Sequence, residues 1–247
     1  MKAVLFRQHG GPDVLEHTDV PDPVLEPGHL LVRVKACSVN HLDLWIRQGI
    51  PTYRIRLPHI SGCDVSGMVE RVGDGVSGVA PGDRVVLAPG LSCGACEWCT
   101  RGDDNLCVSY GIRGSASPGG YAELISAKAA EAIRLPKDLS FEEAAAFPLA
   151  FLAAWHMLVG RANLQAGETV LVHAAGSGIG HAAVQIATHL RARVFTTVGS
   201  EAKVPKAKAL GAEAVIDYRR ENFEERVKQL TEGRGVDVVF EHIGPQT

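Results

Sequence analysis

The 247-residue sequence predicts an α/β fold in which a β-rich first half precedes a parallel sheet covered by helices. Two observations carry this prediction. The first half holds several short apolar stretches separated by turn residues, a pattern typical of a small barrel or sandwich. The second half alternates short β-branched stretches with helical ones, and this alternation indicates right-handed crossovers between parallel strands.

The composition is that of a soluble globular protein, with 46% apolar residues, 21% charged residues and a formal net charge of −3. No basic run is present, so we expect no nucleic-acid partner. The apolar run near the N-terminus is too short for a signal peptide, and the longest apolar run, Ala144–Trp155, contains Pro148. We therefore expect no membrane partner and a cytoplasmic location, where the six cysteines are thiols or metal ligands.

The first half reads as a series of strands with one helix inside it. Leu30, Val32 and Val34 recur with a period of two, which predicts a half-buried strand over 30–35. The predicted helix runs from Asn40 to Gln48. Further strands are expected at Ala3–Phe6, Val65–Val72, Arg84–Ala88, Tyr121–Ser126 and Ala132–Leu135. A helical stretch, Phe141–Leu158, then leads to the second half, so we place one domain at 1–148 and another at 149–247.

Residues 89–108 contain four cysteines with the spacing Cys-x2-Cys-x2-Cys-x7-Cys. Four thiolates this close can complete a tetrahedral site and leave no open position for water, which favours structural zinc over a catalytic metal. An iron–sulfur cluster uses the same ligands, but this spacing differs from the common ferredoxin patterns. The predicted zinc ligands are Cys93, Cys96, Cys99 and Cys107.

The stretch Glu168–Leu190 predicts a strand, a tight turn and a helix. Thr169–Val172 is β-branched enough for a buried parallel strand, and the helix begins after a glycine-rich turn. Such a turn exposes backbone N–H groups at a helix N-terminus, which binds phosphate. The turn departs from the usual G-x-G-x-x-G frame, so a purely structural turn stays open. The predicted cofactor-binding residues here are Gly176, Ser177, Gly178, Ile179 and Gly180.

The remaining chain continues the alternation. We expect strands at Arg193–Val198, Ala214–Asp217 and Val236–Phe240, and helices at Glu201–Leu210 and Asn222–Leu230. The second strand is followed by Ser200 where NAD-binding sheets usually carry an acid. Ser200 can bond a 2′-phosphate and Lys203 can neutralise it, which favours NADP(H). Glu201 could instead bond a ribose diol, so NAD(H) stays open.

The four-cysteine lobe, the stretch Gly119-Gly120-Tyr121-Ala122-Glu123 and the nucleotide-binding half together resemble the medium-chain dehydrogenase/reductase superfamily. Within it, the chain is similar to zinc-type alcohol dehydrogenases and quinone oxidoreductases. The resemblance implies a GroES-like β-barrel domain followed by a doubly wound Rossmann sheet that is incomplete, because family members continue past this chain's C-terminal end. It also implies hydride transfer to or from a small-molecule substrate and a full-length parent that is a homodimer or homotetramer.

Family alcohol dehydrogenases bind a second, catalytic zinc. Their cysteine, histidine and third ligand correspond here to Asn40, Cys63 and about Leu149. A neutral amide, one thiol and an alkyl side chain do not make a three-ligand open site, so we expect no catalytic zinc. His41 could still join Cys63 and Asp64 around an ion, which would make the chain an alcohol dehydrogenase with an atypical metal site.

Val39-Asn40-His41-Leu42-Asp43 instead matches the pattern of the zinc-independent quinone oxidoreductases. The Asn40 amide can donate a hydrogen bond to a substrate oxygen that gains charge, and Asp43 can orient that amide or ribose hydroxyls. Cys63 is a third candidate catalytic residue, as a proton donor. The competing interpretations are an N-cap for Asn40 and a core position for Cys63. A non-catalytic NADPH-binding or structural protein is the alternative from a different class.

Overall fold

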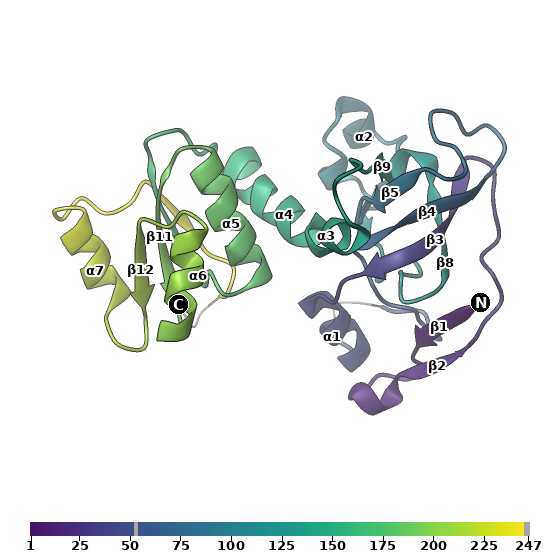
Figure 1. The fold of residues 1–247 in the computed structure, drawn as a ribbon, viewed down its shortest axis with the longest axis horizontal. Coiled ribbons are helices and arrows are strands. Elements are labelled where there is room, and N and C mark those ends of the chain that lie inside the picture. Colours follow the sequence, from purple (N-terminus) through teal and green to yellow (C-terminus); the bar gives the residue numbers. More distant parts are fainter. Residues whose placement is uncertain (52–53, 245–247) are drawn as a thin grey trace. The chain divides into compact units, whose positions relative to one another are not determined.

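The computed structural model describes residues 1–51 and 54–244 and divides into two compact units, Met1–Pro148 and Leu149–Thr247. Figure 1 shows the elements of both units along the chain. Among the described residues, no helix combines the length and the apolar character that crossing a membrane requires.

The first unit is built around a five-stranded antiparallel sheet with the strand order β8-β3-β4-β5-β9. Alternate residues on these strands, such as Leu30, Val32, Val65 and Val69, are buried in one core, as the period-two pattern predicts. The strands are β3 (His29–Cys37), β4 (Val65–Val72), β5 (Arg84–Leu87), β8 (Leu124–Lys128) and β9 (Ala132–Arg134).

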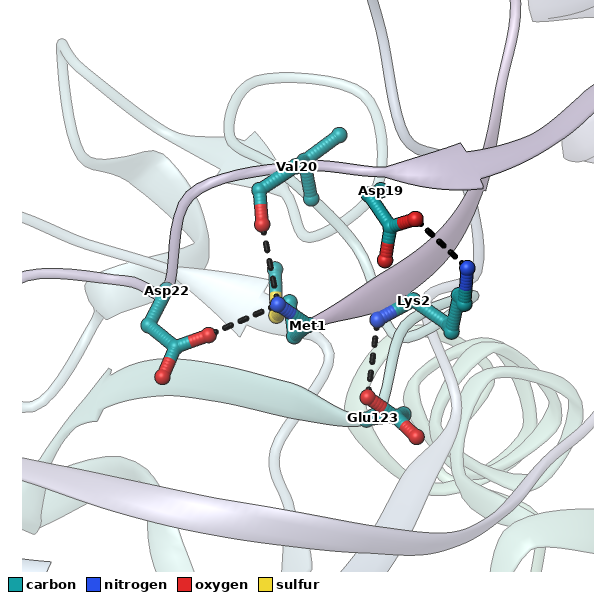
Figure 2. A network of polar contacts seen from close by, with 6 residues as sticks. All are labelled: Met1, Lys2, Asp19, Val20, Asp22 and Glu123. Carbon is teal, nitrogen blue, oxygen red and sulfur yellow. Dashed lines mark hydrogen bonds and ion pairs between the residues drawn. The ribbon is translucent and has the colours of Figure 1, made fainter.

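The N-terminal strand pairs with a second strand that the sequence analysis does not predict. β1 (Lys2–Leu5) and β2 (Glu16–Asp19) form an antiparallel pair, with a 3-10 turn, η1 (Pro12–Val14), between them. The Met1 ammonium donates to the Val20 carbonyl at 2.9 Å and to the Asp22 carboxylate at 2.8 Å (Figure 2). The Lys2 N–H donates to the Glu123 carboxylate at 2.7 Å, which fixes the pair against the segment that enters β8.

The other elements of this unit lie between the strands or after them. They are α1 (His41–Gln48), β6 (Gly90–Leu91), α2 (Glu97–Arg101), η2 (Asp104–Leu106), β7 (Gly111–Ile112), η3 (Ala129–Glu131) and α3 (Phe141–Ala146). The Ser140 hydroxyl accepts the Glu143 N–H at 3.1 Å, and the Glu143 carboxylate accepts the Ser140 N–H at 2.9 Å. This capping box starts α3, which packs on β3 and β4.

The sequence predicts one continuous helical stretch over Phe141–Leu158, and this prediction is wrong because the structure has separate helices there. α3 ends at Ala146, and a separate helix, α4 (Pro148–Trp155), passes into a π-helical segment, η4 (His156–Arg161). Pro148 has no N–H group to donate to the Ala144 carbonyl, so the helical hydrogen-bond pattern is interrupted at Phe147.

The second unit contains a four-stranded sheet, and all its pairs are parallel, in the order β12-β11-β10-β13. The strands are β10 (Thr169–Val172), β11 (Arg193–Val198), β12 (Ala214–Asp217) and β13 (Val238–Phe240), and the helices are α5 (Gly178–His189), α6 (Val204–Ala209) and α7 (Phe223–Leu230). α5 and α6 share one apolar cluster with Val170 and Val194, whereas Val227 of α7 packs with Leu171 and Phe195. Helices therefore cover both faces.

The predicted helix over Glu201–Leu210 begins as a 3-10 turn, η5 (Glu201–Lys203), before α6. Pro205 has no N–H to donate to the Glu201 carbonyl, so an uninterrupted α-helix cannot form there.

The strand order creates a topological switch point beside β10. The chain leaves β10 toward β11 and β12, and later returns to pair β13 on the other side of β10. In open parallel sheets, ligands bind in the crevice that opens beyond the carboxyl ends of the two strands at such a point. The glycine-rich turn directly follows β10 and therefore lies at this crevice.

Candidate functional site

The glycine-rich turn between β10 and α5 has a fixed internal geometry. Ser177 is the N-cap of α5, and its hydroxyl accepts the Gly180 N–H at 2.9 Å. Ala174 adopts a left-handed conformation with φ of 54°, which few non-glycine residues adopt. A Cβ on Gly180 would collide with the Ala174 carbonyl oxygen, so the close approach of helix to turn requires glycine there.

The N-terminus of α5 offers free donors to an anion. Gly178 and Ile179 are its first residues, and N–H groups at these positions have no intrahelical acceptor. A Cβ on Gly176 would lie 3.1 Å from the Nζ atom of Lys203, so the lysine ammonium lies against the same turn. Helix dipole, donors and ammonium all favour a bound phosphate.

The structure places the two candidate selectivity residues, Ser200 and Lys203, at the end of β11 and in η5. Glu201, the residue that favours a ribose diol, forms an exposed ion pair with Arg220 at 2.8 Å. Tyr218, which is not among the residues predicted from the sequence, follows β12, and its hydroxyl lies where a Gly199 side chain would be. Its position depends on the β11–β12 register, which the sequence does not reveal.

In the first unit, Asn40 directs its amide toward the loop that follows residue 60. The Asn40 Nδ2 atom donates to the Asp64 carboxylate at 2.9 Å and lies 3.4 Å from the Cys63 Sγ and 3.3 Å from the Ser38 Oγ. Ser38 also donates to Asp64, at 3.2 Å. We call Ser38, Asn40, Cys63 and Asp64 the polar cluster. Asn40 is the N-cap residue of α1, and the Asp43 carboxylate accepts its backbone N–H, as in a capping box.

Asp43 accepts hydrogen bonds from three segments around this cluster. Its two carboxylate oxygens accept the Asn40 N–H at 2.7 Å, the Gly62 N–H at 2.9 Å and the Tyr121 hydroxyl at 2.9 Å. Asp43 is buried, and these bonds hold three separate segments together. Asp43 therefore ties the start of α1 to Gly62 and to Tyr121. From the sequence, Tyr121 is expected only as part of a motif and as the first residue of a predicted strand.

Cys63 in the polar cluster and its neighbour Cys37 are both neutral thiols. Burial raises the pKa of Cys37 to about 12, and the nearby carboxylates of Asp43 and Asp64 add to the effect. Burial also raises the pKa of Cys63, and the negative charge of the nearby Asp64 carboxylate raises it further. Cys63 is fully buried, which is the environment of a core thiol and a poor one for a proton donor.

The four cysteines of the lobe converge in space. Their sulfur atoms all lie within 4.8 Å of one another, with Cys96 and Cys99 at 3.5 Å and Cys93 and Cys99 at 3.8 Å. Tetrahedral Zn–S bonds of about 2.3 Å place sulfur atoms about 3.8 Å apart, so the donor set fits zinc. Backbone N–H groups of Ala95 and Cys96 lower the pKa of Cys93 to about 6, which favours the thiolate.

Over residues 1–51 and 54–244, this quartet is the only group of three or more His, Cys, Asp or Glu side chains with converging ligand atoms. The alternative set of His41, Cys63 and Asp64 does not form such a group in the described residues.

Comparison with known proteins adds family evidence to this geometry. Residues 26–137 match the model of the alcohol dehydrogenase GroES-like domain, and residues 178–247 match that of zinc-binding dehydrogenase. The chain is 32% identical to human quinone oxidoreductase over 242 residues, which are 98% of this chain and 66% of that protein. It thus spans slightly less than two thirds of that relative.

Two solved structures extend the comparison. A structure described as an NAD-dependent alcohol dehydrogenase matches with a TM-score of 0.96 and 50% identity, covering 99% of this chain and 71% of that one. A mycobacterial protein complexed with NADPH matches with a TM-score of 0.79 and 35% identity, covering 99% and 67%. The α/β fold class, with a GroES-like domain before a Rossmann sheet, is thereby confirmed.

Proposed function

The chain belongs to the medium-chain dehydrogenase/reductase superfamily, and on that premise we propose that its parent enzyme transfers a hydride between NADP(H) and a quinone, enone, carbonyl or alcohol. One observation carries the proposal. The glycine-rich turn lies at the switch point of a parallel sheet, with unbonded helix N–H groups and the Lys203 ammonium beside it. This arrangement suits a pyrophosphate.

The preference for NADP(H) is argued from Ser200, Lys203 and the Glu201–Arg220 pair. Because Arg220 partly neutralises Glu201, a 2′-phosphate near Ser200 meets less repulsion than the sequence alone suggests. The NAD-dependent relative at 50% identity favours NAD(H) as the second candidate. Lys203 can serve either cofactor through the pyrophosphate, since its ammonium lies against Gly176.

The polar cluster supplies the chemistry expected of the first unit. A bound nicotinamide would supply or accept the hydride. The Asn40 amide has two hydrogens. Asp64 receives one, and the other, which has only the longer contacts to Cys63 and Ser38, is the one we assign to a substrate oxygen that gains negative charge. The Ser38 hydroxyl donates its hydrogen to Asp64 and so helps to hold that carboxylate beside the Asn40 amide. Asp43 acts through its bond to the Asn40 backbone.

We assign zinc to Cys93, Cys96, Cys99 and Cys107, where it stabilises the lobe. No substrate step involves it, because four cysteine ligands leave no position open. The alcohol dehydrogenase alternative needs a second zinc at Cys63, and among the described residues Cys63 belongs to no group of three converging His, Cys, Asp or Glu ligands, which argues against that.

The test combines metal content with turnover. We expect one zinc per chain and NADPH oxidation with 1,4-benzoquinone, 2-cyclohexenone or benzaldehyde, the last distinguishing carbonyl from alkene reduction. An Asn40→Ala variant should lose about 100-fold in turnover number if the amide stabilises the oxyanion. Two zincs would favour the alcohol dehydrogenase alternative, and tight NADPH binding without turnover on any of the three would favour a non-catalytic nucleotide-binding protein.

A further inference from the structure

His242 contacts the glycine-rich turn from a distant part of the sequence. It follows β13, and its Nε2 atom lies 2.9 Å from the hydroxyl oxygen of Ser177, 65 residues earlier. β10 and β13 are neighbours in the sheet, with Val172 paired to Phe240. The bond therefore spans the switch point, joining the two loops between which a dinucleotide would enter.

The other hydrogen bonds of the Ser177 hydroxyl show which of the two residues, Ser177 or His242, donates the hydrogen between them. The hydroxyl oxygen accepts the Gly180 N–H at 2.9 Å, and it lies 2.9 Å from the Ala174 carbonyl oxygen. A carbonyl oxygen only accepts, so the single hydroxyl hydrogen goes to Ala174. The remaining lone pair of Ser177 must then accept a hydrogen from His242. All three contacts are satisfied only when His242 carries its hydrogen on Nε2.

This assignment leaves the other ring nitrogen without a hydrogen. The Nδ1 atom of His242 is buried and has no hydrogen-bond partner among residues 1–51 and 54–244. Burial lowers the pKa of the ring, so it is neutral near pH 7, with one N–H only. A buried nitrogen that only accepts costs less free energy when it lacks a partner than a buried N–H donor does. The surroundings of His242 therefore favour the form that carries its hydrogen on Nε2.

We propose that His242 is a positioning residue for the dinucleotide turn, donating from Nε2 to Ser177 and holding that hydroxyl in the orientation that caps α5. The inference rests on the proposed cofactor site. With the cap fixed, Gly180 donates to Ser177 while the N–H groups of Gly178 and Ile179 remain directed at the ligand. Without His242, the Ser177 side chain gains rotational freedom and the turn loses its order before the cofactor arrives.

The chain offers a matched pair of substitutions. His242→Gln puts an amide nitrogen near the position of Nε2 and keeps the donor. His242→Asn puts its amide nitrogen near the position of Nδ1 and loses the donor toward Ser177. His189→Ala is the control for loss of a histidine, because His189 is exposed at the end of α5.

NADPH and NADH titrations followed by nicotinamide fluorescence test the proposal, with adenosine 2′-monophosphate as a ligand that lacks the pyrophosphate. We expect His242→Asn to weaken binding of the preferred dinucleotide about tenfold, His242→Gln to stay within about threefold of wild type, and His189→Ala to bind as wild type. Affinity for adenosine 2′-monophosphate should not change, whereas general loosening of the unit would lower it too.

Three results would overturn the proposal: wild-type affinity in His242→Asn, equal losses in the Asn and Gln variants, or parallel losses for adenosine 2′-monophosphate. A nitrogen-15 NMR spectrum that assigns the hydrogen of His242 to Nδ1 would also overturn it, and that spectrum needs no nucleotide. Failure of wild type to bind either dinucleotide would instead remove the proposed function, and this inference with it.

Discussion

At the scale of single residues, the turn after β10 depends on which atoms can approach one another. Gly180 is needed because the Ala174 carbonyl oxygen occupies the place of a side chain. Gly178 has no such neighbour, since a Cβ there would meet only the Ala150 Cβ at 3.8 Å, an ordinary contact. Two glycines of one motif therefore have different physical roles.

We expect Gly180→Ala to lower the free energy of unfolding of the second unit by about 1–3 kcal/mol, because backbone atoms must move. Gly178→Ala, in the first turn of α5, should leave it within about 0.5 kcal/mol. Urea unfolding followed by circular dichroism measures both. Equal destabilisation of the two variants would contradict the assignment of the close approach to Gly180.

Lys203 provides a second prediction at this scale. We expect Lys203→Ala to weaken NADPH binding about tenfold or more, because a charged donor beside the turn is lost. Lys206→Ala is the control, since Lys206 is an exposed residue of α6. A larger loss for NADPH than for NADH would assign the ammonium to the 2′-phosphate, and equal losses would assign it to the pyrophosphate. Unchanged binding of both would contradict any cofactor role.

At the scale of elements, the cysteine lobe gains little stability from the packing of its helix. Its helix, α2, has five residues and buries none of them. An isolated helix of that length is unstable in water, so its geometry must come from the loop around it. Zinc bound by the four thiolates would supply that constraint.

We expect Cys99→Ser to lower the zinc content from about one per chain toward zero and to expose the lobe to limited proteolysis. Cys37→Ser is the matched control, because Cys37 lies on β3 outside the lobe. Dinucleotide binding by the second unit should persist in both variants. Full zinc retention by Cys99→Ser, measured by mass spectrometry of the metal, would contradict the site.

Parts of this architecture could be predicted from the sequence because their signals are local. Strand and helix periods, the cysteine spacing and the glycine-rich turn all lie within short stretches. The contact between His242 and Ser177 could not be predicted, because it depends on the pairing of β10 with β13. The bonds from Asp43 to Gly62 and Tyr121 likewise join segments that only the tertiary fold brings together. The roles of Asn40, Asp43 and Cys63 stay predictions.

At the scale of the whole molecule, both units bury histidines in neutral form. Burial lowers the pKa of His59 in the first unit and of His173 in the second. In the unfolded chain the histidine pKa is about 6.5, so below that pH the unfolded chain binds more protons than the folded chain does. The free energy of unfolding therefore falls as the pH drops below about 6.5.

We expect urea unfolding to show lower stability at pH 5.5 than at pH 7.5. His59→Gln should reduce that difference, because the amide can still donate to the Gly114 carbonyl, which lies 2.7 Å from His59 Nε2, but does not titrate. His189→Gln, at an exposed position, should leave the difference unchanged. Higher stability at pH 5.5 than at pH 7.5 would contradict the account.

The central claim is that the second unit is a dinucleotide-binding unit that prefers NADPH, and isothermal titration of the 247-residue chain with NADPH and NADH tests it most directly. We expect saturable binding at one site per chain, with NADPH bound more tightly than NADH. Tighter binding of NADH would reverse the assignment of Ser200 and Lys203, and the absence of saturable binding by either nucleotide would contradict the claim itself.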